Sequence, residues 1–272
     1  MRRINIETCI TKEFLERTYS TDTKLFANDD FEDKYHTYYE HIITEIEEDA
    51  FRNFINLEEI RLRYVRLKSS ILPETLLNGL SRLRSFMLPD SSIRILSPRM
   101  FIDNKMLKDV CISANKSLRC LPQGLFDPCC DNLELLTLME NSLDTLPDDI
   151  FYKCRKLRSI HLNANNLTTI SENLFQSQEN LTTLDLSGNQ ITSISGKSFR
   201  NLRNLRHLNL SNNRLTSIPD DLLDGLPNLV SLNLNLNQLS SIPEGLYHKL
   251  PNLEITSYRD PRYFLKEFRL YG

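Results

Sequence analysis

Residues 181–204 read LTTLDLSGNQITSISGKSFRNLRN, and two further blocks follow without a gap: LRHLNLSNNRLTSIPDDLLDGLPN (205–228) and LVSLNLNLNQLSSIPEGLYHKLPN (229–252). Each block has 24 residues and the pattern LxxLxLxxNxL, followed by an aliphatic residue, a large apolar residue and a closing Asn. A fixed period in this range is typical of a solenoid, in which each repeat packs mainly on its neighbours. This internal repeat therefore decides the fold.

The same pattern extends toward the N-terminus, with repeats that begin at Leu57, Leu83, Leu107, Leu133 and Leu157. These five and the three blocks above make eight recognisable repeats, and a degenerate repeat begins at Asp33. We therefore expect an N-terminal flank or imperfect cap at 1–32, the repeat array at 33–252 and a degenerate, uncapped tail at 253–272. In the tail, Thr256 falls in an aliphatic slot.

Each repeat is expected to supply one short strand, since positions 4 and 6 of LxxLxLxxNxL are apolar and alternate with polar residues. Strands supplied once per repeat stack in parallel, and each connection passes over the other side of the coil. The sequence thus predicts an α/β repeat solenoid with a parallel concave sheet and an irregular or short helical convex side.

Two columns of residues recur once per repeat. The Asn at position 9 falls where the chain leaves the strand, and its amide can satisfy backbone groups that the bend would otherwise leave unpaired. This predicted Asn ladder comprises Asn115, Asn141, Asn165, Asn189, Asn213 and Asn237. The second column is expected to form a buried spine and comprises Phe101, Phe126, Phe151, Phe175 and Phe199, continued by Leu223 and Tyr247.

These repeats resemble the typical leucine-rich repeats of extracellular and receptor proteins over Leu57–Asn252. Residues 120–151, CLPQGLFDPCCDNLELLTLMENSLDTLPDDIF, and residues 180–204 further resemble Toll-like receptor ectodomains, those of insect Toll receptors in particular. The resemblance implies a leucine-rich-repeat horseshoe. Family members also have cysteine-rich caps, a transmembrane helix and a cytoplasmic signalling domain, so the resemblance implies a fragment, a truncated gene model or a soluble form.

The composition does not favour nucleic acid or membrane as a partner of this chain. The 33 Lys and Arg residues against 36 Asp and Glu residues leave a net charge of -3 and no global field toward an anionic surface. No apolar run reaches the length of a transmembrane helix, and the start MRRINIETCITKEF lacks the apolar core of a signal peptide. No nucleophile with a base, phosphate loop or metal set is present, so we expect a non-enzymatic protein without a cofactor.

Outward strand positions 3, 5, 7 and 8 are where a solenoid of this kind binds its partners. Binding energy concentrates on Arg, aromatic and large apolar side chains, and these occur in the front half, whereas the last three repeats carry mostly small polar groups there. The candidate protein-binding residues are Arg61, Arg63, Tyr64, Met87, Leu135, Met139 and His161.

Cysteines and glycosylation motifs bear on the compartment. Cys129 and Cys154 each lie three residues after a Phe of the spine, and neighbouring coils about 5 Å apart would allow a disulfide between them; two packed free thiols are the alternative. Cys9, Cys111, Cys120 and Cys130 remain unassigned. The motif N-x-[ST] occurs at Asn115, which belongs to the ladder, and at three candidate glycosylation sites: Asn166, Asn180 and Asn209.

The sequence as a whole favours a protein-recognition module of the Toll-like receptor ectodomain type, acting in innate immune or developmental signalling. By resemblance, its partner would be a cystine-knot cytokine of the Spätzle kind or a microbial product, and a homodimer is a further expectation. The alternative is a secreted or surface adhesion or matrix protein without a signalling role. Either reading implies an extracellular or cell-surface location.

Overall fold

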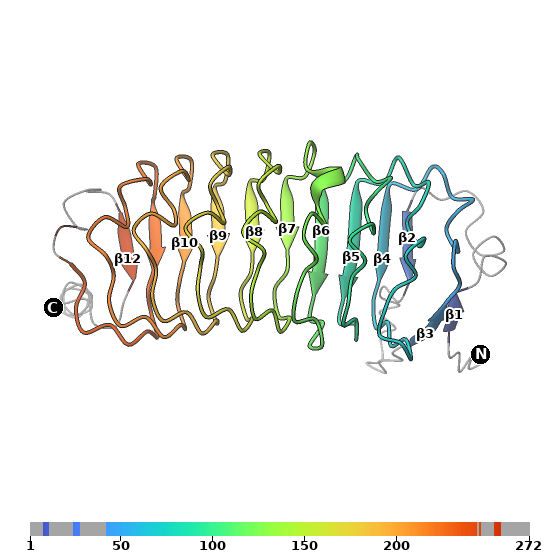
Figure 1. Cartoon of the computed structure of the whole chain (residues 1–272), viewed down its shortest axis with the longest axis horizontal. Coiled ribbons are helices and arrows are strands. Elements are labelled where there is room, and N and C mark those ends of the chain that lie inside the picture. Colours follow the sequence, from blue (N-terminus) through green and yellow to red (C-terminus); the bar gives the residue numbers. More distant parts are fainter. Residues whose placement is uncertain (1–7, 11–23, 28–41, 244, 246–252, 257–272) are drawn as a thin grey trace, which may run out of the picture. The chain divides into compact units, whose positions relative to one another are not determined.

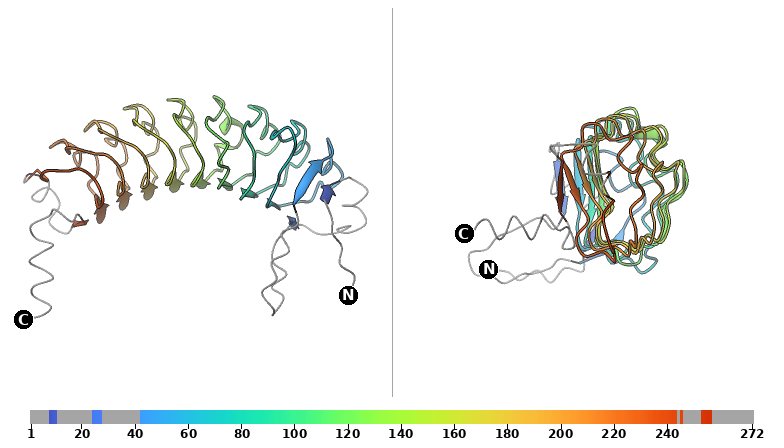
Figure 2. Two further views of the ribbon diagram at one scale, coloured as in Figure 1. Left: turned by 90° about the horizontal axis from the view of Figure 1, so that it is seen from below. Right: turned by 90° about the vertical axis from the view of Figure 1, so that its left-hand side faces the viewer.

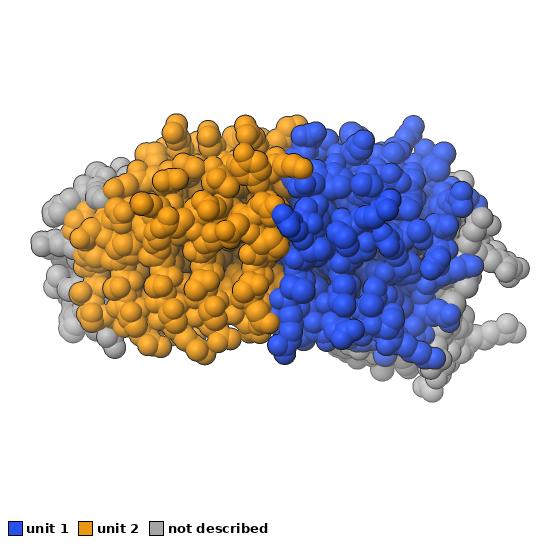
Figure 3. Space-filling model, viewed as in Figure 1, with its two compact units in different colours: residues 1–142 blue, residues 143–272 orange. Residues whose placement is uncertain are grey.

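The computed structural model describes residues 8–10, 24–27, 42–243, 245 and 253–256. The chain divides into two compact units, residues 1–142 (unit 1) and 143–272 (unit 2), which Figure 3 shows in different colours. Each unit is described by itself.

Unit 1 is built on a parallel sheet (Figure 1). Its strands lie in the order β2-β4-β5-β6-β7, with the bounds β2 Lys24–Ala27, β4 Glu59–Leu62, β5 Ser85–Pro89, β6 Asp109–Ser113 and β7 Leu135–Thr137. A separate parallel pair joins β1 (Thr8–Ile10) to β3 (Ile43–Ile46). Strand β2 lies within 1–32, the segment for which the sequence predicts a flank or imperfect cap, and it pairs directly with β4.

Unit 2 contains a parallel row of strands in the order β8-β9-β10-β11-β12. Their bounds are β8 Ser159–His161, β9 Thr183–Asp185, β10 His207–Asn209, β11 Ser231–Asn233 and β12 Glu254–Thr256. Ile255 of β12 pairs with Leu232, the apolar position 4 of the preceding repeat. The interval is therefore 23 residues (255 − 232), which explains why a 24-residue count assigns the aliphatic slot to Thr256. The boundaries at 32/33 and 252/253 stay predictions.

Short strands follow from the alternation of apolar and polar residues. Strands β7, β8, β9 and β11 have one buried residue between two half-buried ones, and the buried residues at positions 4 and 6, such as Leu184 and Leu186, are 0% exposed. Between residues 42 and 243 the return segments are made mainly of turns and contain one 3-10 helix, η1 (Asp127–Cys129). In Figure 2 the strands line one side of the coils in each unit. The predicted parallel solenoid with one strand per repeat is confirmed.

The Phe column lies in the core of both units. In unit 1, Phe101 meets Phe86 edge-on at 5.7 Å and stacks on Phe126 at 6.1 Å. In unit 2, Phe175 lies 6.0 Å from Phe151 and 6.1 Å from Phe199. All of these rings are 0% or 1% exposed, so the column fills the coils. Tyr247 lies outside the described residues.

The Asn side chains of position 9 connect consecutive repeats. In unit 1, Asn141 Nδ2 donates to Ile112 O and Leu138 O, both at 2.8 Å, while Asn141 Oδ1 accepts from Asn115 N at 2.8 Å. In unit 2, Asn189 Nδ2 donates to Leu162 O and Leu186 O at 3.0 Å. Each side chain thus satisfies backbone groups of two repeats at the bend that ends the strand.

A second set of amides connects the return segments, and it includes the closing Asn of the repeat pattern. Buried Asn104 donates to the carbonyls of Leu77 and Leu80 at 3.0 Å. The closing Asn at the end of several repeats makes one exposed bond each to the preceding repeat: Asn132 to Lys105 O, Asn180 to Arg155 O, Asn204 to Glu179 O and Asn228 to Arg203 O. Backbone groups outside the strands are therefore also paired between repeats.

The predicted bridge between Cys129 and Cys154 is wrong. Cys129 is free and fully buried, with its Sγ donating to Phe126 O at 3.2 Å, whereas Cys130 and Cys154 are both disulfide-bonded. The repeat that begins at Leu107 has 26 residues (133 − 107), and η1 takes up extra length after the Phe. Counted back from the next leading Leu, Cys130 and Cys154 both stand three residues before it (Leu133 and Leu157). The prediction failed because it counted forward from the Phe.

Candidate recognition surface

The sheet of unit 1 places the outward side chains in lateral rows. Position 5 forms the row Arg61, Met87, Cys111 and Thr137, which are partners in register on β4, β5, β6 and β7. All four residues are half-buried. Because partners in a parallel sheet project to the same face, two predicted binding residues, Arg61 and Met87, are neighbours on one surface.

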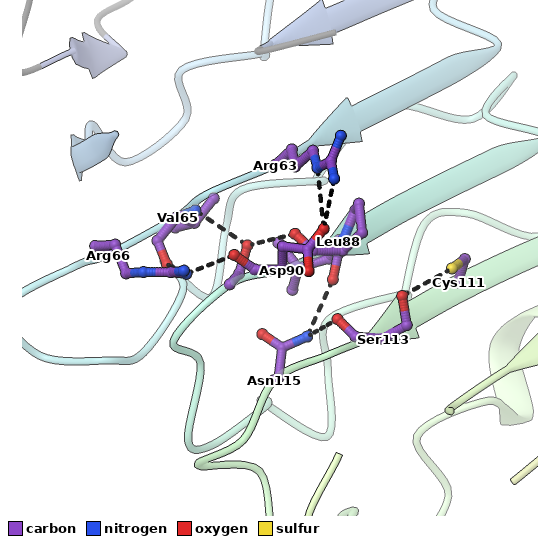
Figure 4. Close-up of polar contacts among 10 residues, drawn as sticks. Arg63, Val65, Arg66, Leu88, Asp90, Cys111, Ser113 and Asn115 are labelled. Atoms are coloured by element: carbon purple, nitrogen blue, oxygen red, sulfur yellow. Dashed lines mark hydrogen bonds and ion pairs between the residues drawn. The ribbon is translucent and has the colours of Figure 1, made fainter. Parts of the chain in front are cut away.

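Arg63 and Tyr64 form a second part of this surface, just after β4. The guanidinium of Arg63 lies 4.7 Å from the centre of the Tyr64 ring. It also pairs with Asp90 through Nη2 at 2.9 Å and Nε at 3.0 Å (Figure 4). Two donors on one carboxylate fix the orientation of an Arg side chain, and its stacking on an aromatic ring adds about 0.5–1 kcal/mol. Arg63 is therefore held in place before any partner arrives.

Asp90 connects two repeats, a role that sequence reasoning missed. Its carboxylate holds Arg63, and its backbone carbonyl accepts from Arg66 Nη1 at 2.5 Å. Both Tyr64 and Asp90 have positive φ, 58° and 50°, as residues at position 8 do in repeat after repeat. A non-glycine residue in this conformation carries a cost of order 1 kcal/mol, so the contacts of Arg63 stabilise two unfavourable backbone positions.

The Asn ladder is replaced by other residues beneath this surface. Val65 occupies the Asn position of its repeat, and Ser91 occupies it in the next one. Ser91 Oγ accepts from Val65 N at 3.0 Å and donates to Pro89 O at 3.0 Å, while Asn115 Nδ2 reaches Leu88 O at 3.0 Å (Figure 4). The bend keeps its hydrogen bonds, although the repeats that carry Arg63 and Asp90 depart from the consensus.

The remaining predicted binding residues lie further along the strands. Leu135 on β7 is the register partner of Asp109 on β6, and Met139 follows β7, where its carbonyl accepts from Ala114 N at 3.1 Å. His161 belongs to unit 2 and is the register partner of Asp185. All three are half-buried. Arg61, Arg63, Tyr64 and Met87 are therefore the candidates that the structure brings together most closely.

Position 5 has a structural role in unit 2. Asp185 Oδ1 accepts from Ser187 N at 2.9 Å, and Asn209 and Asn233 make the same contact two residues on, at 3.2 and 3.1 Å. Short Asx side chains of this kind stabilise the backbone turn that follows them. In unit 1, the residues at position 5 include Arg61, Met87 and Cys111, whose side chains cannot make this Asx contact. Position 5 therefore stabilises a turn in three repeats of unit 2, whereas His161, in the first repeat of unit 2, has no Asx side chain there.

Two ionisable groups on the surface of unit 1, Asp109 and Cys111, have pKa values above their ordinary ones. Burial raises the pKa of Asp109, and nearby Glu134 raises it further, against a lowering by Lys108. Burial also raises the pKa of the Cys111 thiol, although its contact with Ser113 Oγ at 3.5 Å and the charge of Arg61 lower it. At neutral pH, Cys111 is therefore a protonated thiol and a weak nucleophile.

No group of three or more His, Cys, Asp or Glu residues in the described ranges could hold a metal ion. Within those ranges there is also no helix of sufficient length and hydrophobicity to span a membrane.

The three glycosylation candidates differ in how their amides are engaged. Asn180 Nδ2 donates to Arg155 O at 2.9 Å and Asn209 Nδ2 donates to Asp185 Oδ2 at 3.3 Å, whereas Asn166 is engaged through Oδ1, which accepts from Gln190 Nε2 at 3.3 Å. A glycan attaches at Nδ2. We therefore expect higher occupancy at Asn166 than at Asn209 when the chain is expressed through a secretory pathway, as measured by glycopeptide mass spectrometry. Higher occupancy at Asn209 would contradict this ranking.

The stacked strands, the Asn ladder and the Phe spine define a leucine-rich-repeat solenoid. A family model described as BspA type leucine rich repeat region matches residues 21–140 and 121–254, with six copies. The chain belongs to this family of BspA-type leucine-rich-repeat proteins. No curated protein matches the sequence.

Solved structures with the same fold include receptors of the Toll class. TLR13 in its complex with ssRNA13 is 23% identical with a TM-score of 0.68, over 77% of this chain and 30% of TLR13. Drosophila Toll in its complex with Spätzle is 24% identical with a TM-score of 0.59, over 83% of this chain and 37% of Toll. These matches confirm the predicted likeness to Toll ectodomains at the level of the fold.

A bacterial protein shares the fold as well. The leucine-rich-repeat protein LIC12759 of Leptospira interrogans is 23% identical with a TM-score of 0.55, over 79% of this chain and 59% of that protein. The chain thus spans between about a third and three fifths of the length of these three proteins.

Proposed function

We propose that the chain is a non-enzymatic protein-recognition module that binds a polypeptide through the sheet surface of unit 1. The observation that carries the proposal is the fixed group formed by Arg63, Tyr64 and Asp90 beside the row of Arg61 and Met87. Arginine, tyrosine and methionine are enriched at protein interfaces. A preordered arginine and ring lose little conformational entropy when a partner binds.

A protein partner is favoured over RNA, although the solved TLR13 complex contains ssRNA. The net charge of this chain is -3, and Arg63 is already neutralised by Asp90, whereas nucleic-acid affinity depends on uncompensated positive charge. By likeness to Toll, which was solved with Spätzle, the partner would be a cytokine-like or microbial protein in innate immune or developmental signalling. The alternative is an adhesion or matrix role without signalling.

We place this function outside the cytosol, in a secreted protein or a cell-surface ectodomain. The disulfide-bonded state of Cys130 and Cys154 supports that location, because disulfides persist in oxidising compartments and are rare in the cytosol. The direct measurement is peptide mass mapping, under non-reducing conditions, of the protein purified from its native source, which shows whether Cys130 and Cys154 are disulfide-bonded. Free thiols at both positions would contradict the proposed compartment.

The surface itself is tested with the variant Arg61→Ala, Tyr64→Ala, Met139→Ala in one chain. We expect loss of most capture of the physiological partner in a pull-down, because truncation of one interface anchor typically costs about 2 kcal/mol or more. The matched control replaces three exposed residues of unit 2 outside the strands, Arg203, Tyr152 and Gln238, with Ala. Undiminished capture by the first variant would contradict the assignment.

A further inference from the structure

We propose that Asp109 of unit 1 receives a lysine or arginine side chain from the partner polypeptide. This inference rests on the proposed function and specifies the chemistry of the partner. It concerns a second row of the same sheet, position 3, in which Glu59, Ser85, Asp109 and Leu135 are register partners on β4, β5, β6 and β7.

The geometry of this row suits a long cationic side chain. Ser85 lies between Glu59 and Asp109, each one strand away at a spacing of about 4.8 Å. Leu135, on the other side of Asp109, is half-buried and apolar. Lys and Arg side chains pack their methylene groups on apolar surface while the charged end stays polar. The row therefore offers both kinds of contact that such a side chain needs.

Charge compensation on this surface is incomplete at one point. Arg63 pairs with Asp90 at 2.9 Å, and Lys108 pairs with Glu134 at 3.9 Å. The Asp109 side chain makes no hydrogen bond or ion pair with the described residues, although it is half-buried. Lys108 attracts the Asp109 carboxylate only from beyond ion-pair distance, and burial and Glu134 outweigh that attraction. A partly buried carboxylate in such surroundings is unfavourable in the free protein, and a cation supplied by the partner would remove that cost.

Ser85 is an independent indication of a missing ligand group. The residue is 8% exposed, and its hydroxyl has no hydrogen-bond partner. A buried hydroxyl without a partner costs about 1–3 kcal/mol, and buried polar groups in native proteins are usually satisfied. An ammonium or guanidinium group bound at Asp109 would lie one strand from Ser85, whose Oγ could accept a hydrogen bond from it.

A metal ion does not account for the row, because the described residues contain no group of His, Cys, Asp or Glu that could hold one. We therefore assign the cation to a side chain of the partner. Its binding should depend on pH through Asp109, whose pKa is raised by burial and by Glu134 and Glu59, against a lowering by Lys108. As the pH falls, Asp109 gains its proton at a higher pH than an ordinary aspartate, and the site for the cation is lost.

The inference is tested by selection from a displayed random dodecapeptide library on the immobilised full chain. The selected peptide is synthesised with its Lys or Arg, and again with norleucine there, and binding is measured by fluorescence polarisation. We expect selection of basic peptides and about tenfold weaker binding both for Asp109→Asn and for the norleucine peptide. The two losses should not add, because each change removes the same contact.

The control variant is Asp131→Asn, which alters an exposed aspartate outside the strands and should leave binding unchanged. If Asp109→Asn does not fold, as judged by circular dichroism, acidification of the wild-type chain removes the same charge, and binding must then weaken. Selected peptides without basic residues, or equal binding by Asp109→Asn, would overturn the inference and leave the proposed function intact. If the selected peptides bind the variant Arg61→Ala, Tyr64→Ala, Met139→Ala as tightly as the wild-type chain, the proposed surface is contradicted instead. If the library yields no binding peptide at all, the proposed function and this inference are both contradicted.

Discussion

Phe175→Ala is expected to lower the free energy of unfolding by about 4 kcal/mol. The ring of Phe175 is 1% exposed and lies between those of Phe151 and Phe199 at 6.0 and 6.1 Å. Its truncation removes two ring contacts and leaves a cavity that the neighbouring coils are too rigid to fill. Urea denaturation monitored by circular dichroism measures the loss.

Two controls separate packing from the removal of an aromatic ring as such. Phe175→Leu should cost only about 1 kcal/mol, since Leu223 stands at this position of the spine two repeats later and is 3% exposed. Tyr152→Ala removes a ring that is 47% exposed and should change stability by less than about 1 kcal/mol. Equal losses for Phe175→Ala and Tyr152→Ala would show that the spine does not stabilise unit 2.

Asn189→Ala is expected to cost about 3 kcal/mol, because it leaves several buried backbone groups without partners. Asn189 Nδ2 donates to Leu162 O and Leu186 O, and Oδ1 accepts from Leu167 N, each at 3.0 Å. The residue is 6% exposed, so water cannot readily replace these bonds. The same denaturation experiment measures the effect.

Asn204→Ala is the matched control for the ladder. Asn204 also bonds to the preceding repeat, to Glu179 O at 2.9 Å, but it does so at an exposed site through one bond. Solvent can take over that bond, and the loss should stay below about 1 kcal/mol. If the two Asn variants unfold at the same denaturant concentration, burial is not what makes the ladder stabilising.

The fold could be predicted from the sequence because the same information is repeated many times. A Leu or Ile at positions 4 and 6, an Asn at position 9 and a Phe in the return segment recur at a fixed spacing, so one irregular repeat does not hide the pattern. Where the spacing changes, prediction failed. The extra residues before Leu133 moved the disulfide-bonded position from Cys129 to Cys130, and the short last interval puts Ile255, instead of Thr256, in register with Leu232.

The surface could be predicted only in part. The consensus shows which positions face outward, and residue type suggested Arg61, Tyr64 and Met87. It does not show which side chains pair with one another: the pairing of Arg63 with Asp90 spans 27 residues, and Lys108 forms its ion pair with Glu134 and not with Asp109. Such differences follow from side-chain conformation, which a repeat pattern leaves open.

The reactivity of the buried Cys129 thiol can be used to measure local unfolding around η1. It is 0% exposed, and burial raises its pKa to about 12, whereas Cys120 is exposed and free. An alkylating reagent needs both access and thiolate, so Cys120 should be labelled at once and Cys129 only when η1 detaches from the core. The rate at which Cys129 is alkylated thus measures how often this part of unit 1 opens, and no cysteine has to be introduced by mutation.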